Sequence, residues 1–404
     1  MSMQIQKMMA EEIGGSIDIP DSSYEAAQKR YGDLGKWLKE SLKSKSAQFK
    51  PHVFSQGSFR LGTVIKPLGM NDYDLDLSCK LQQGITKENY TQEQLKELLG
   101  ADLEAYRLER HIEEKLERRH RCWRLYYQDG LKFHIDTVPC IPEIDHVRQI
   151  LQERMIEAGE AKFLAEQVAQ LAVSITDDRK PSYRVISPDW NISNPEGYAQ
   201  WFVNQMKQAG RFLESMAINA KVAKVDDLPV YKWRTPLQRC VQILKRHRDI
   251  MFESNNDGKP ISIIITTLAA RAYRGEDNIE TAMQGVLSQM GGFVKEQQPR
   301  VPNPVNPIED FADKWRTEEG RRLRLEENFW RWLNQAKADF GALGSSGDIK
   351  YLVEQASEKF GTRLNSDELK IKLGSVASIS AVGKGLADQT PKRPVDLRGG
   401  GRLG

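Results

Sequence analysis

The sequence predicts an α+β protein with two lobes, in which a mixed β-sheet with one long helix packs against a helical lobe. The 404 residues exceed what a single core usually organises. Alternating strand patterns are confined to the segment before about residue 142, and the second half carries mainly helical patterns. With 39% hydrophobic and 28% charged residues, the composition is that of a globular protein with a real core.

The boundaries of these parts follow from the patterns along the chain. Residues 21–45 begin with Asp and Ser cap candidates and space their apolar side chains helically, which predicts one long amphipathic helix. Residues 177–195 are rich in turn formers and suit a boundary between lobes. We therefore expect a sheet-containing lobe with the long helix at 1–180, a helical lobe at 181–365, and a flexible Gly-rich tail at 366–404.

Charge and hydropathy exclude several classes of protein. The net charge is only +3, so stable binding to duplex nucleic acid is not expected, because such binding depends on many Lys and Arg side chains. Small anionic substrates remain compatible. We find no signal peptide and no apolar run long enough to cross a membrane, which predicts a cytoplasmic protein without a membrane partner. A monomer is the default expectation.

Two carboxylates share one face of the first clear strand. The segment DYDLDLS alternates, so Asp74 and Asp76 point to one face while Leu75 and Leu77 point to the core. Their positions along the strand are about 7 Å apart. An acidic pair of this kind is often only a solvated strand edge.

A third carboxylate, Asp136, lies in FHIDTVP on the same face as His134. This run and the one before it flank Asp129–Gly130, which predicts an antiparallel hairpin. If the strand of Asp136 neighbours that of Asp74 and Asp76, three acids meet and raise one another's pKa. Two Mg²⁺ ions, or Mn²⁺ in their place, would relieve the repulsion. His134 lacks a partner at zinc spacing and is interpreted as a tolerated strand residue.

A glycine-serine turn precedes these acids in QGSFRLGT. Gly57 would let backbone N–H groups approach a triphosphate, and the hydroxyl of Ser58 could donate to it. Gln56 and Arg60 flank the turn, and Arg60 is available for the same anion. Most Gly-Ser pairs are plain turns, so the indication of catalysis comes from the order of turn, Asp-x-Asp strand and hairpin aspartate.

Together these motifs resemble the DNA polymerase β-like nucleotidyltransferase superfamily. Within it, they are similar to the bacterial cyclic-oligonucleotide synthases of CBASS antiphage systems, which are related to cyclic GMP-AMP synthase and oligoadenylate synthase. The runs LQRCVQILKRHRD and KPISIIITTLAA of the helical part extend the resemblance, which covers about 20–360.

The resemblance implies a bilobal enzyme with its active site between the lobes. It would join ATP and other NTPs with release of pyrophosphate, and Asp74, Asp76 and Asp136 would hold two metal ions. Lys245 and Ser262 match the positions of a lysine and a serine near the donor triphosphate. Alternatively, Lys245 is a surface lysine within the basic tract 245–248, and Ser262 is a helix N-cap.

The chain ends in GGGRLG, which is similar to ubiquitin-like tails. Synthases of this family are often encoded beside ubiquitin-transfer-like enzymes, so the resemblance implies an E1/E2-like partner that conjugates the protein through Gly404. A plain disordered end is the alternative.

Two other functions fit the same residues. A linear template-independent nucleotidyltransferase, such as an RNA-tailing enzyme or an oligoadenylate synthase, would use the same carboxylates. A non-catalytic nucleotide or RNA sensor would tolerate the loss of one of them, and the presence of all three disfavours it.

Overall fold

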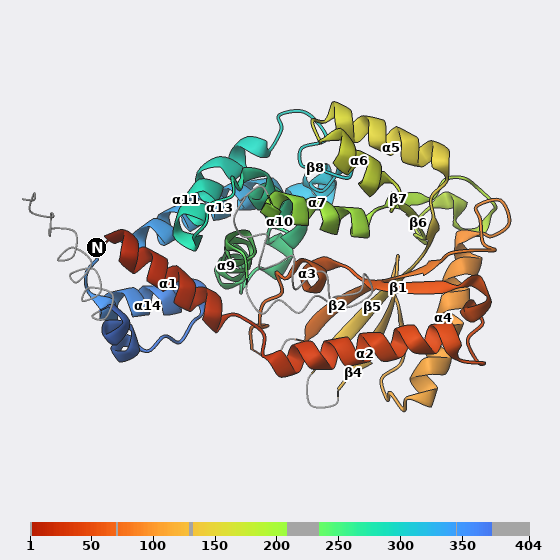
Figure 1. Cartoon of the computed structure of the whole chain (residues 1–404), viewed down its shortest axis with the longest axis horizontal. Coiled ribbons are helices and arrows are strands. Elements are labelled where there is room, and N and C mark those ends of the chain that lie inside the picture. The colour runs from red at the N-terminus through yellow and green to blue at the C-terminus, as the bar shows by residue number, and fades with distance from the viewer. Residues whose placement is uncertain (1, 70–71, 129–131, 208–233, 345, 374–404) are drawn as a thin grey trace, which may run out of the picture.

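The structure, a computed structural model, describes residues 2–69, 72–128, 132–207, 234–344 and 346–373. Figure 1 shows a twisted sheet with α2 and α4 towards one end of the molecule and most of the helices towards the other. This arrangement confirms the predicted α+β class. The predicted turn Asp129–Gly130 and the end of the chain with Gly404 lie outside the described residues.

A mixed sheet forms the first part. The strands are β1 (Pro51–Ser55), β2 (Tyr73–Leu81), β3 (Glu117–Arg118), β4 (Trp123–Tyr127), β5 (Phe133–Pro142), β6 (Val173–Ile175) and β7 (Asn191–Ser193). Their order is β1-β2-β5-β4-β3, with β6 and β7 added beyond β5. Among the strands that the structure describes, only β2 and β5 pair in parallel, and β4 and β5 form the predicted antiparallel pair. The central position therefore belongs to the two strands with the candidate carboxylates.

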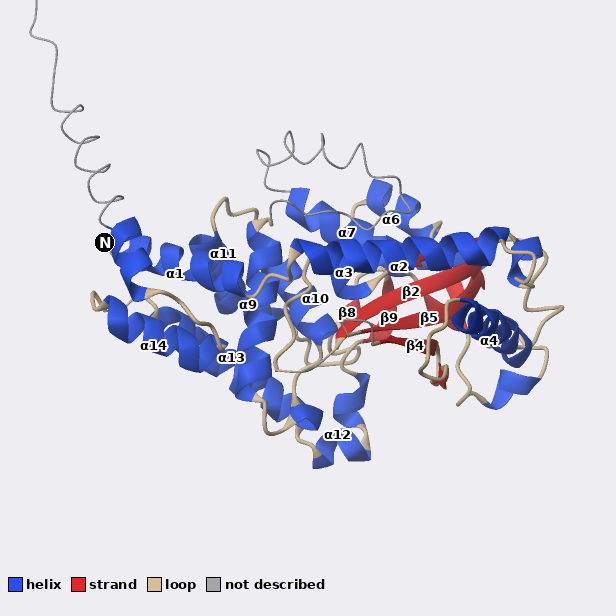
Figure 2. Ribbon diagram, turned by 90° about the horizontal axis from the view of Figure 1, so that it is seen from below, coloured by secondary structure: helices blue, strands red, loops and turns tan. Residues whose placement is uncertain are grey.

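Two helices cover the apolar face of this sheet, namely α2 (Asp21–Glu40) and α4 (Gln92–Glu109) (Figure 2). The predicted helix at 21–45 is thus shorter than expected, and Leu42 is fully exposed rather than part of the apolar stripe. The carboxylate of Asp102 on α4 explains the early end. Its oxygens accept hydrogen bonds from the backbone nitrogens of Lys45 and Ser46 at 2.8 and 2.7 Å, which draws the chain out of the helix.

The second part is helical and has its own apolar core. It contains α7 (Pro195–Lys207), α9 (Pro236–Met251), α10 (Ser262–Ala272), α11 (Ile279–Gln289), α12 (Glu318–Arg322), α13 (Leu325–Ala342) and α14 (Ile349–Phe360). Helices from the first 180 residues add side chains to the same core, among them α1 (Ser2–Ser16), α5 (Asp145–Glu157) and α6 (Lys162–Ala169). The lobe boundaries at 180 and 365 stay predictions.

Two further segments in the second half of the chain form regular structure. The proline-dense stretch after residue 299 forms a hairpin of β8 (Pro302–Asn303) and β9 (Asn306–Asp310). Residues 366–373, placed in the tail by the sequence, are helical, and Leu369 is buried in the helical core. The burial of this one side chain helps to offset the entropy of ordering the segment. None of the helices in the described ranges has the length and apolarity that a bilayer crossing requires.

Candidate active site

The parallel pairing of β2 and β5 brings the three predicted carboxylates together. The register places Asp76 directly opposite Asp136, and Asp74 lies one alternation away on the same face. The intervening Leu75 and Ile135 are fully buried on the opposite face. One oxygen from each of the three carboxylates lies within 4.8 Å of the others. The sheet alone is therefore sufficient to assemble the triad.

The triad carries strong electrostatic strain. Burial, followed by the charges of Asp74 and Asp136, raises the pKa of Asp76 to about 8. Arg124 and Lys245 act in the opposite direction. At neutral pH, Asp76 therefore tends to keep its proton in the protein without a metal. A bound cation would favour the ionised form.

Two basic side chains contact the triad. Arg124 on β4 donates from Nε and Nη2 to the two oxygens of Asp136, at 2.6 and 2.7 Å. These hydrogen bonds to Asp136 raise the pKa of Arg124. His134 Nε2 lies 3.0 Å from Asp74 Oδ1, so this residue is more than a tolerated strand position. Neither contact was predicted from the sequence.

The missed pairing of Arg124 has a specific cause. A two-residue turn at 129–130 would place Arg124 opposite Ile135, with its side chain on the wrong face. The observed register instead pairs Tyr127 with Phe133 and Arg124 with Asp136. A shift of one residue exchanges the faces of a strand, so only the exact register could have identified Arg124.

Gly57 lies against the triad because it has no side chain. It begins the short helix α3 (Gly57–Leu61) with φ at +63°, in the left-handed region. A Cβ atom there would lie 2.4 Å from Asp76 Oδ2. The preceding nitrogen of Gln56 donates to the carbonyl of Asp76 at 2.9 Å, whereas the Gln56 side chain accepts from Ser78 at 3.1 Å. The glycine-serine segment is thus joined directly to the strand of the acids, and Arg60 lies half-buried on α3.

Lys245 reaches this region from α9 in the helical part. It is 6% exposed, and its Nζ donates to the carbonyl of Thr63 at 2.9 Å. Burial and Arg248 lower its pKa to about 8, while Asp249, Asp76 and Asp74 oppose the shift. The interpretation as a surface lysine is therefore wrong, and the whole tract 245–248 is buried.

Ser262 lies one contact further away. It is the first residue of α10, and the N-cap is Ile261, so the interpretation as an N-cap is wrong. Its Oγ accepts a hydrogen bond from Arg248 Nη1 at 2.9 Å. Ser262 is thus connected to the basic tract of α9 through Arg248.

A cavity of about 380 Å³ joins these pieces. Ser58, Asp74 and Lys245 are among its lining residues, so it brings together the glycine-serine segment, the triad and the helical part. Its other lining residues are Val64, Ile65, Pro67, Leu68, Gly69, Asp72, Tyr73, Arg248, Asp249, Glu253, Asn256 and Lys259.

The donor set suits a divalent metal bound by oxygen. Carboxylates are the ligands that hard cations prefer, and two such ions about 3.5–4 Å apart can bridge the oxygens of a phosphoryl transfer. Cations from the helical part line the adjoining cavity and suit a polyphosphate. The arrangement can therefore support transfer of a phosphoryl or nucleotidyl group.

Comparisons with known proteins agree with this chemistry. Residues 51–140, which span β1 to β5, match the family model described as "Cyclic GMP-AMP synthase DncV-like, nucleotidyltransferase domain". The chain carries a DncV-like nucleotidyltransferase domain. The protein is therefore a nucleotidyltransferase, as the sequence predicted.

Relatives extend the similarity beyond this nucleotidyltransferase domain. The chain is 27% identical over 316 residues to a c-di-GMP synthase of Roseivirga ehrenbergii, covering 77% of this chain and 73% of the relative. It is 24% identical over 384 residues to the cyclic dinucleotide synthase CdnG of Bradyrhizobium diazoefficiens, covering 89% and 81%.

Solved structures show the same bilobal fold. CdnG of Bradyrhizobium diazoefficiens in complex with GTP aligns at a TM-score of 0.59 and 18% identity, over 93% of this chain and 99% of that one. CdnC of Escherichia coli MS115-1, in a complex with HORMA-deltaN, aligns at 0.56 and 13%, over 90% and 98%. The fold of this chain is therefore that of the CD-NTases.

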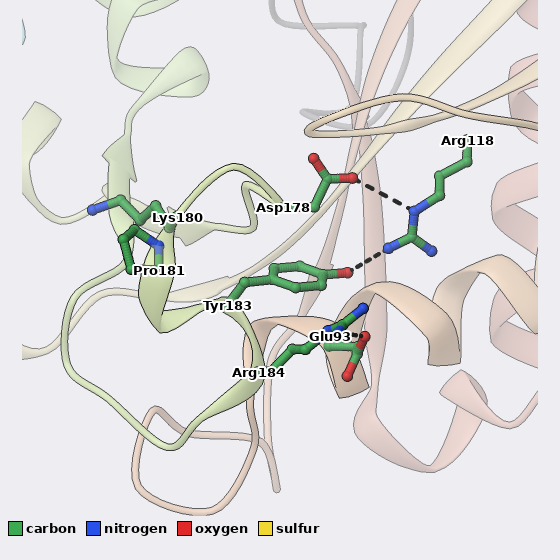
Figure 3. A pocket seen from close by; sticks show the side chains of 7 residues that line it. All are labelled: Glu93, Arg118, Asp178, Lys180, Pro181, Tyr183 and Arg184. Carbon is green, nitrogen blue, oxygen red and sulfur yellow. Dashed lines mark hydrogen bonds and ion pairs between the residues drawn. The ribbon is translucent and has the colours of Figure 1, made fainter.

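A second hollow lies on the nucleotidyltransferase domain, between α4, β3 and the segment 178–184 (Figure 3). Its charged side chains already have protein partners. Arg118 lies 3.5 Å from Asp178 and donates to the hydroxyl of Tyr183 at 2.8 Å, and Arg184 donates to Glu93 at 3.1 Å. The charges that line this hollow therefore stabilise the contact between α4 and the turn-rich segment 177–195.

Three aromatic side chains lie in or close after the turn-rich segment 177–195. Tyr183, Tyr198 and Trp201 are all buried, and their polar atoms bond to Arg118, Thr267 and Glu160 respectively. All three are therefore core residues.

Proposed function

We propose that this nucleotidyltransferase joins two NTPs into a cyclic dinucleotide, with release of pyrophosphate, as a second messenger in antiphage defence. The observation that carries the proposal is the triad of Asp74, Asp76 and Asp136, beside a cavity whose lining includes Lys245, Arg248 and Lys259. The names of the two relatives support a dinucleotide product. Because one of them is named a c-di-GMP synthase, GTP is the first substrate to test, with ATP next.

The triad would hold two Mg²⁺ ions, with Mn²⁺ as a substitute. When bound, these ions lower the pKa of the attacking ribose hydroxyl and neutralise the charge on the leaving pyrophosphate. The chain's own residues provide position. Arg124 fixes the orientation of Asp136 through two hydrogen bonds, and the missing side chain of Gly57 leaves room for the carboxylate of Asp76.

Donors around the cavity would hold the triphosphate. The hydroxyl of Ser58 and the ammonium of Lys245 line the same space as Asp74, and Ser262 supports Arg248 behind them. Arg60 and the backbone at Gln56 and Gly57 are proposed as further nucleotide contacts. Ring closure requires the linear intermediate to turn, so that its remaining triphosphate meets the same carboxylates.

The remaining parts of the proposal concern the setting of the enzyme. We propose a cytoplasmic monomer that an E1/E2-like partner conjugates through Gly404. Deletion of Gly404 should abolish conjugation in the presence of such a partner, and unchanged conjugation would contradict this part.

The test is incubation of the purified protein with all four labelled NTPs and Mg²⁺ or Mn²⁺, followed by phosphatase treatment and mass analysis. We expect a phosphatase-resistant cyclic dinucleotide, absent from the Asp74→Ala/Asp76→Ala variant. Asp145→Ala provides a control, because this acid on α5 is almost fully exposed. Linear products would favour a linear nucleotidyltransferase. Absence of any product with either metal, with partner proteins and phage-derived activators supplied, would favour a nucleotide sensor.

A further inference from the structure

Besides Lys245, further cations of the helical part line the cavity beside the triad. The space lined by Asp74 and Ser58 is also lined by Arg248 and Lys259. Arg248 follows Lys245 by nearly one turn of α9, so both project to the same side of the helix. Lys259 comes from the loop between α9 and α10. Three cations from the helical part therefore line one cavity.

Contacts place these cations at different points of the cavity. Lys245 Nζ donates to the carbonyl of Thr63 at 2.9 Å, just after α3, the helix whose first residue lies against Asp76. Lys259 Nζ instead lies 3.8 Å from Asp249 Oδ1. Lys245 therefore contacts the segment next to the triad, and Lys259 lies on the side of Asp249.

Arg248 and Lys259 converge on a single carboxylate oxygen. Asp249 Oδ1 accepts from Arg248 Nε and Nη2 at 2.9 and 2.6 Å, and it lies 3.8 Å from Lys259 Nζ. Arg248 Nη1 also donates to the carbonyl of Pro260 and to Ser262 Oγ, so the guanidinium is fixed on several sides. The contact of Lys259 is longer than a hydrogen bond, and a third of its side chain is exposed. This ammonium can therefore reach a ligand in the cavity.

We propose that Lys259, with Arg248 behind it, binds the terminal phosphate of the nucleoside triphosphate whose first phosphate lies at the triad. The inference rests on the proposed function, because it places the reacting phosphate at Asp74 and Asp76. The second and third phosphates extend away from the reacting phosphorus atom. Lys245 and then Lys259 line the cavity that leads away from the triad. Lys259 then distinguishes triphosphates from diphosphates, since only a triphosphate extends to it.

The test compares binding of two ligands that differ by one phosphate. The α,β-methylene analogues of GTP and GDP resist cleavage at the bond that the reaction breaks, so calorimetry with Mg²⁺ measures binding alone. We expect Lys259→Ala to weaken the triphosphate analogue about tenfold, the range for one charge-assisted hydrogen bond, and to leave the diphosphate analogue unchanged. Lys259→Arg should restore most of the difference.

Lys359→Ala is the matched control, because Lys359 pairs with a neighbouring carboxylate and its side chain is similarly exposed, at 30%. Equal weakening of both analogues, or no change in either, would overturn the inference. A wild-type protein that binds the analogues but makes only linear products would refute the cyclic product without affecting this result. A wild-type protein that binds neither analogue would refute both.

Discussion

Replacement of Gly57 by alanine tests how closely the triad depends on one missing side chain. The new Cβ would lie 2.4 Å from Asp76 Oδ2, whereas ordinary contacts begin near 3.4 Å. The carboxylate must therefore move by about 1 Å, and a displacement of this size costs about a hundredfold in rate. We expect kcat for product formation to fall by about that factor, while KM for the NTP changes little.

The backbone contributes a separate effect that needs its own control. Alanine at φ +63° costs about 1–2 kcal/mol of stability, because the left-handed region is disfavoured for residues with a Cβ. Gly159 has φ +94°, and a Cβ added there would have no atom within 4 Å, so Gly159→Ala reproduces the backbone cost without touching the triad. Both variants should lose a few degrees in Tm, and only Gly57→Ala should lose activity. Retention of more than a third of the wild-type kcat by Gly57→Ala would refute the reasoning.

Three further predictions concern the charges around the triad. Because the pKa of Asp76 is raised from 3.8 to about 8, the folded protein without metal holds a proton that the unfolded chain has lost, so stability falls as pH rises between these values. Asp76→Asn removes this loss, and its Tm in EDTA should exceed that of the wild type by more at pH 8 than at pH 5; an equal difference at both would contradict the assignment. Arg124→Ala removes the guanidinium that balances the charge of Asp136 through two hydrogen bonds. Because only a metal can then balance this charge, Mg²⁺ should raise the Tm of the variant by more than that of the wild type in thermal scans. Lys245→Met should raise KM for the NTP about tenfold in steady-state kinetics, and a loss in kcat with constant KM would show that the lysine does not bind the ground state.

Local patterns were sufficient to predict the strands of the triad. Alternation around Asp74 and Asp76 shows which side chains share a face, and the buried Leu75 and Leu77 confirm it. The prediction that a second strand supplies Asp136 is also confirmed, because β5 pairs with β2 and places Asp136 opposite Asp76. These conclusions depend on a period of two residues, which a sequence displays directly.

Contacts that depend on register or tertiary packing could not be predicted in this way. Lys245 resembled a surface lysine because its neighbours on α9 are polar, yet these polar side chains bond to backbone carbonyls of the segment 61–66. Gln238 donates to Leu61 and Gln242 donates to Val64, at 2.9 and 2.8 Å. Polar side chains that are buried because they bond to backbone carbonyls do not change the periodicity of apolar residues. The pattern alone therefore predicted that this face of α9 is solvated.

The parallel pairing of β2 and β5 has a consequence for how the chain can change. Because the sheet closes the distance between Asp76 and Asp136, the number of residues joining the two strands is not what places the carboxylates. Insertions in the exposed loops between them should leave the triad in place. One residue added inside β5 before Asp136 would instead turn this carboxylate into the layer now occupied by Ile135. Changes in length should therefore be tolerated in these loops but not within the strands, because the phase of each strand, rather than the spacing between motifs, places the carboxylates.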